Sequence, residues 1–178
     1  MANFADANRS HPVHGNSPPP HPAFSSLAKL GVLLALSGLV AMIGTQFGPG
    51  AWYDHIAKPA WNPPNWVFGP VWTALYVLMA VAAWRVWRKP ATQAVDDALF
   101  FYGVQLALNA IWSPMFFGLQ NPLIALMDIV LLLAVAGVTT AMFWRIDRVA
   151  GMLFLPYAAW VAFATALNAA VWSLNRVI

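Results

Sequence analysis

The chain has 178 residues, of which 61% are hydrophobic and 8% are charged, whereas a soluble globular domain carries roughly a quarter charged residues. This composition excludes an ordinary soluble domain, and a formal charge of +3 without a basic cluster argues against nucleic acid as a partner. The absence of Cys excludes disulfides, thiolate metal sites and covalent haem attachment.

Residues 1–26 are polar and interrupted by prolines. Such a segment cannot bury enough apolar surface to offset the entropy lost on ordering, so we expect a disordered tail. We expect no metal site from His11, His14 and His21, because their spacing has no scaffold to fix it. Residues 27–178 are expected to form one membrane domain.

Apolar runs recur along that domain, each of about 20 residues, which is enough for a helix to cross a hydrocarbon core of about 30 Å. Segments of about ten residues with alternating polarity, typical of a membrane barrel, do not occur. The sequence therefore predicts an all-α integral membrane protein, a bundle of five transmembrane helices. The predicted spans are 30–47, 66–86, 98–117, 122–143 and 150–174.

The basic residues are unevenly divided between the two sides of these spans. Seven fall on the side of the N-terminus and two on the other side, so the positive-inside rule places the N-terminus inward and the first loop outward in a cytoplasmic membrane. A bacterial membrane, inner or outer, is the expected location. The seven are Arg9, Lys29, Arg85, Arg88, Lys89, Arg145 and Arg148, and the two are Lys58 and Arg176.

The first loop, residues 48–65, is the only long connection. Its prolines and glycines forbid a regular helix, whereas Trp52, Tyr53 and Trp61 make it too apolar for a free linker. We expect this loop to fold onto the bundle as a lid.

Three spans carry aromatic and amide side chains at helical spacing. Amides in hydrocarbon need partners or face a cavity, and aromatic faces with a few amides suit a pocket for a flat hydrophobic ligand. The alternative is that these side chains only pack the helices together. The residues are Trp72 and Tyr76 on the second span, Gln105, Asn109, Trp112 and Phe116 on the third, and Trp160, Ala164 and Asn168 on the fifth.

Residues 52–73 resemble the W-Y-x-x-L-x-K-P-x-W-x-P-P-x-W-x-F-x-x-V-W signature of the TspO/MBR family, the tryptophan-rich sensory proteins, with Ile56 in place of Leu. Residues 105–114 and 155–168 agree with it. The resemblance implies five helices, a receptor, sensor or transporter role, and a porphyrin ligand, protoporphyrin IX or haem, held without a covalent cofactor. The family's pocket maps onto Tyr53, Trp72, Asn109 and Trp160, and more loosely onto Trp66, Trp112 and Asn168; helix geometry adds Tyr76.

The resemblance also implies a homodimer, which we place on the third span, where Gly103, Ala107 and Ala110 permit close backbone approach in lipid. Asp128 is the only acid inside a span. Two interpretations stay open for it, an interhelical hydrogen bond and a functional carboxylate, and a proton relay would need a second acid.

The sequence contains no general acid–base pair, nucleophile triad or phosphate loop. Light- and oxygen-dependent porphyrin degradation stays open as an enzymatic alternative, with Trp72 and Trp160 as the reactive groups. A lipid or sterol carrier is the third alternative.

Overall fold

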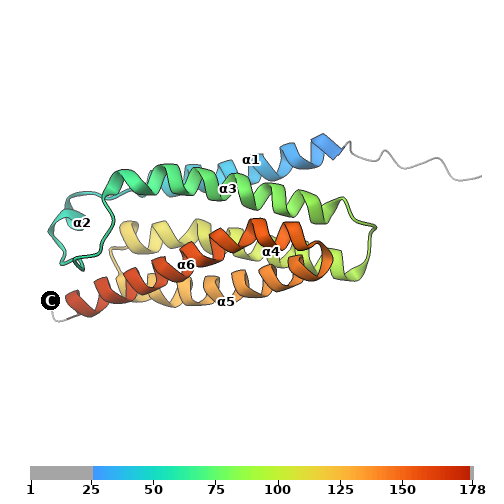
Figure 1. The fold of residues 1–178 in the computed structure, drawn as a ribbon. Helices are drawn as coiled ribbons and strands as arrows, with labels where there is room; N and C mark the ends of the chain where they lie inside the picture. Colours follow the sequence, from blue (N-terminus) through green and yellow to red (C-terminus); the bar gives the residue numbers. More distant parts are fainter. Residues whose placement is uncertain (1–25, 177–178) are drawn as a thin grey trace, which may run out of the picture.

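The structure, a computed structural model, describes residues 26–176, and the expected N-terminal tail lies almost wholly outside them. Within this range the chain forms helices and no strand (Figure 1). Five of the helical segments are long and apolar enough to cross a membrane, which confirms the all-α, five-span prediction. The elements are α1 (Ser26–Gln46), α2 (Ala51–His55), α3 (Asn65–Trp87), α4 (Gln93–Ser113), the π-helical turn η1 (Pro114–Gly118), α5 (Pro122–Ile146) and α6 (Arg148–Asn175).

Side chains cap the beginnings of three of the spans. Thr92 accepts a hydrogen bond from the Val95 amide, Asn121 from the amides of Leu123 and Ile124, and Asp147 from the Ala150 amide. Each cap satisfies amides that have no partner inside the helix. α4 begins at Gln93, five residues before the predicted start at residue 98, because Asp96 and Asp97 are stabilised in the first turns of a helix rather than ending it.

The prediction that the first loop contains no regular helix is wrong for residues 51–55, which form α2. Pro49 and Pro59 leave enough proline-free chain between them for one helical turn. The remainder of the loop has no regular structure. We call residues 48–64 the lid segment.

The bundle places α5 against both α4 and α6, and α1 against α3 and α4. Figure 1 shows the lid segment at one end of the bundle, together with the C-terminal end of α6 and the α4–α5 connection. The centre is filled by fully buried side chains, among them Met79, Phe143, Phe154 and Tyr157. Phe154 makes edge contacts with Phe143 and Tyr157, at ring centroid distances of 5.2 Å in both cases.

At the opposite end, Asp147 ties the end of α3 to the α5–α6 turn. Its Oδ2 lies 3.0 Å from Arg85 Nη2 and 2.9 Å from Lys89 Nζ, and its side chain is 6% exposed. Burial acts to raise the pKa of the carboxyl, but hydrogen bonds from Lys89, the Ala150 amide and Arg85 outweigh it, so the pKa lies below its ordinary value. Asp147 is therefore a charged link between three spans.

Candidate ligand-binding cavity

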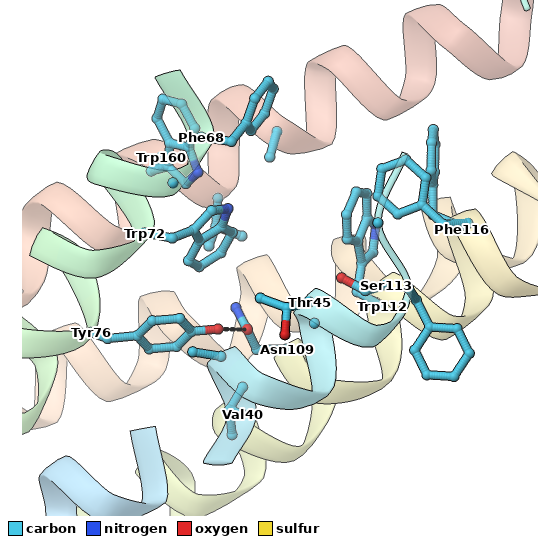
Figure 2. Close-up of a pocket in the computed structure, with 18 of the residues that line it drawn as sticks. Val40, Thr45, Phe68, Trp72, Tyr76, Asn109, Trp112, Ser113, Phe116 and Trp160 are labelled. Carbon is cyan, nitrogen blue, oxygen red and sulfur yellow. Dashed lines mark hydrogen bonds between the residues drawn. The ribbon is translucent and has the colours of Figure 1, made fainter. Parts of the chain in front are cut away.

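A cavity of about 680 Å³ lies in the half of the bundle nearest the lid segment (Figure 2). All five spans contribute to its walls, and Gly48, Pro49 and Tyr53 of the lid segment line it as well. The lining is predominantly apolar, with a few hydroxyl and amide groups. Size and chemistry are those of small-molecule sites, which usually occupy about 300–1,000 Å³.

One wall of the cavity is aromatic and comes from α3 and α6. Trp72 stacks on Tyr76 with ring centroids 5.4 Å apart, and Phe68 meets Trp160 edge-on at 5.9 Å. Figure 2 shows Trp72, Phe68 and Trp160 grouped on the same side of the cavity. Such contacts fix the ring planes, so this wall is a preformed surface for a flat ligand.

Hydrogen bonds between helices hold the polar lining residues in place. Tyr76 Oη donates to Asn109 Oδ1 at 2.7 Å, and Asn109 Nδ2 donates to Tyr157 Oη at 3.4 Å. Farther along the cavity, Trp112 Nε1 donates to Asn168 Oδ1 at 3.1 Å. These bonds satisfy polar groups at membrane depth and join α3, α4 and α6 around the cavity.

The lid end of the cavity is built on an aromatic cluster. Tyr53 of α2 is buried and packs edge-on against Phe116 and Phe117 of η1, at 6.2 and 5.4 Å. Its hydroxyl donates to Asn62 Oδ1 at 3.2 Å. Burial raises the pKa of Tyr53, with the hydrogen bond to Asn62 as a smaller opposing effect, so the hydroxyl stays protonated at neutral pH.

Seven of the eight residues expected to bind a ligand line this cavity. Trp66 does not, because it lies in the first turn of α3 with 76% of its surface exposed. The seven are Tyr53, Trp72, Tyr76, Asn109, Trp112, Trp160 and Asn168.

The contribution of α1 to the cavity was missed by sequence reasoning. Ser37, Gly38, Ala41, Gly44 and Thr45 all line it. These small residues recur three or four positions apart, the spacing of one helix face, and that pattern was the available signal. Small side chains on α1 leave room that larger ones would fill.

Two polar residues singled out from the sequence, Gln105 and Asp128, lie outside the cavity lining. Gln105 is fully buried, and neither polar atom of its side chain has a hydrogen-bond partner among the described residues. Asp128 is also buried, and an interhelical hydrogen bond, one of the two interpretations of this residue, is not found at Oδ2, which lacks a partner within residues 26–176. The stripe predicted on the third span, α4 and η1, therefore divides, with Asn109, Trp112 and Phe116 facing the cavity and Gln105 facing the packed core.

Fold and cavity together define a multi-pass membrane protein with an aromatic cavity inside its helix bundle. Residues 29–173 match the TspO/MBR family, and the chain belongs to that family. It is 40% identical over 151 residues to protein CrtK of Rhodobacter capsulatus, covering 84% of this chain and 94% of that protein. It is 42% identical over 142 residues to a tryptophan-rich sensory protein of Cereibacter sphaeroides, covering 80% and 88%. It is 40% identical over 152 residues to the human translocator protein, covering 83% and 89%.

Proposed function

We propose that this chain is a membrane receptor or transporter that binds a tetrapyrrole, protoporphyrin IX or haem, in the aromatic cavity. The observation that carries the proposal is the cavity of about 680 Å³ lined by Trp72, Trp112 and Trp160. A tetrapyrrole is flat and apolar over its ring and polar at its edge, so aromatic faces suit the ring and the amides suit the edge. The names of two relatives, a sensory protein and a translocator, fit sensing or movement of such a ligand.

The lining favours a metal-free porphyrin over haem. Haem iron usually takes an axial His, Cys, Met or Tyr, and the described residues that line the cavity include none of the first three. The hydroxyls of Tyr53 and Tyr76 are engaged by Asn62 and Asn109. We therefore expect protoporphyrin IX to bind at least as tightly as haem.

The test is an absorbance titration of the purified full-length protein in detergent with protoporphyrin IX in darkness, repeated with haem. Saturable binding above that of protein-free micelles is expected. Trp66→Phe is a matched control, because it changes an indole outside the cavity and should leave the affinity unchanged. Partition no greater than into empty micelles would contradict the proposal.

Light- and oxygen-dependent porphyrin breakdown is a second candidate function, favoured by the presence of Trp72 and Trp160 in one cavity. In this reaction dioxygen is the oxidant and the porphyrin absorbs the light. Illumination of the dark-formed complex separates the two functions. A porphyrin spectrum that survives light and air indicates binding only, whereas bleaching that stops when dioxygen is removed indicates turnover.

We also propose that two copies of the chain associate through α4. Phe100, Gly103, Ala107 and Ile111 are exposed and fall at i, i+3, i+7 and i+11, one face of this helix, whereas Ala110, also expected there, is half-buried against the core. Small residues on such a face let backbones approach closely in lipid. Ala107→Leu should therefore shift the detergent-solubilised protein from dimer toward monomer mass in light scattering, whereas Leu123→Ala on the exposed side of α5 should not. A dimer mass unchanged by Ala107→Leu would rule out this interface.

A further inference from the structure

The side chain of Asn175, the last residue of α6, is hydrogen-bonded to the lid segment 118 positions away in the sequence. Its Oδ1 accepts from the Ala57 amide at 3.0 Å, and its Nδ2 donates to the Ala57 carbonyl at 2.9 Å. The side-chain amide of Asn175 thus bonds both the backbone N–H and the backbone C=O of Ala57. The family match ends at residue 173, so Asn175 lies beyond it.

Aromatic contacts hold the lid segment on either side of this pair. On the N-terminal side, Trp52 and Tyr53 pack against Phe116 at 5.7 and 6.2 Å. On the C-terminal side, Trp61 meets Phe163 of α6 edge-on at 5.7 Å. These contacts are apolar, and none of them involves residues 57–60.

Hydrogen bonds between the lid segment and the helices are few. Where the lid segment runs into α3, the Val67 amide donates to the Pro64 carbonyl. Apart from that junction, the two bonds of Asn175 are the only ones within residues 26–176 that join the lid segment to a span. Lys58 Nζ instead donates to the backbone carbonyls of Asp54 and Ile56, inside the lid segment.

We propose that Asn175 is a latch that keeps the lid segment closed over the cavity and thereby sets the rate at which ligand enters and leaves. The lid segment lines the cavity through Gly48, Pro49 and Tyr53, so raising it opens the lid end of the site. Loss of two neutral hydrogen bonds at an exposed position should increase the open fraction roughly fivefold. The kinetic role rests on the proposed binding function; the mechanical role does not.

The mechanical role is tested without ligand. The chain has no native Cys, so a single spin label at Ala60→Cys reports the mobility of the lid segment in the full-length protein in lipid vesicles. Asn175→Ala should raise the mobile fraction of the label. Asn175→Asp should do the same, because a carboxylate can still accept from the Ala57 amide but cannot donate to its carbonyl.

Ser173→Ala is the matched control, because Ser173 is exposed in the same last turn of α6 and makes no hydrogen bond to the lid segment within residues 26–176. It should leave the spectrum of the label unchanged. An unchanged mobile fraction in both Asn175 variants would overturn the latch. Asn175→Asp keeps the test decisive if Asn175→Ala fails to fold.

The kinetic role is tested by stopped-flow exchange of protoporphyrin IX. Asn175→Ala should raise the dissociation and association rates together, each by roughly fivefold, so that the equilibrium affinity changes less than either rate. Raised label mobility with both rates unchanged would overturn the kinetic proposal. If the unmodified protein binds no porphyrin, the proposed function fails, and the spin-label result alone decides whether Asn175 holds the lid segment.

Discussion

Asp147→Ala is expected to lower the free energy of unfolding by about 2 to 4 kcal/mol. The change removes the N-cap of α6 and the carboxylate that pairs with Arg85 and Lys89. Removing one partner of a fully buried ion pair costs about 3 to 5 kcal/mol. The estimate is lower here because the Arg85 and Lys89 side chains are 34% and 41% exposed, so water can solvate them once the acid is gone.

Asp147→Asn separates the contribution of the N-cap hydrogen bond from that of the carboxylate charge. The asparagine oxygen can still accept from the Ala150 amide, so about 1 kcal/mol of the loss should be recovered. Denaturation of the three proteins in the same detergent, followed by far-ultraviolet circular dichroism, measures both effects. Equal stability of the unmodified protein and Asp147→Ala would mean that packing alone holds the α5–α6 turn.

Acid should reduce the difference in free energy of unfolding between the unmodified protein and Asp147→Asn. The pKa of the Asp147 carboxyl is lowered in the folded protein. The carboxylate charge therefore stabilises the fold fully at pH values above the pKa of Asp in the unfolded chain, about 3.9. This contribution is lost as the pH falls through the folded value. The gap between the two proteins should therefore be constant near neutral pH and narrow below about pH 4. A gap that widens on acidification would show that another group dominates.

The spans could be predicted from the sequence because hydrocarbon requires about 20 apolar residues per crossing, and that length is visible without a structure. The limits of the spans were harder to predict. Hydropathy ends at a charge, but Asp96 and Asp97 lie inside α4, where the helix dipole favours them. Proline was likewise a weak guide, since Pro70 and Pro156 lie within α3 and α6.

The cavity was predictable where a helix carries large aromatics at helical spacing, as Trp72 and Tyr76 do on α3. It was harder to predict on α1, where the signal is a face of small residues such as Gly38 and Gly44, which leave space open instead of filling it. Trp66 matches the family signature but faces outward. Its orientation could not be predicted, because a sequence pattern fixes residue type and spacing and not the rotation of a helix against its neighbours.

Trp72→Phe and Trp160→Phe should each weaken protoporphyrin IX binding roughly twofold to tenfold, which corresponds to the loss of about 0.5 to 1.5 kcal/mol of aromatic contact. Both indoles line the cavity, and each already packs against a neighbour, Tyr76 or Phe68, that a phenyl ring can still touch. The fold should therefore persist. Any photodegradation should fall much further than affinity, because Phe is far harder to oxidise than Trp.

Trp84→Phe and Trp87→Phe are the matched controls for these two changes. Both indoles lie at the basic end of α3, where Arg88 stacks over Trp84 and Lys29 over Trp87 at 4.6 and 5.2 Å from the ring centroids. Neither lines the cavity, so neither change should alter affinity or bleaching. A porphyrin titration and an illumination time course on the four variants measure both properties. Losses as large at Trp84 and Trp87 as at Trp72 and Trp160 would mean that the tryptophans stabilise the bundle generally and that the porphyrin does not bind in this cavity.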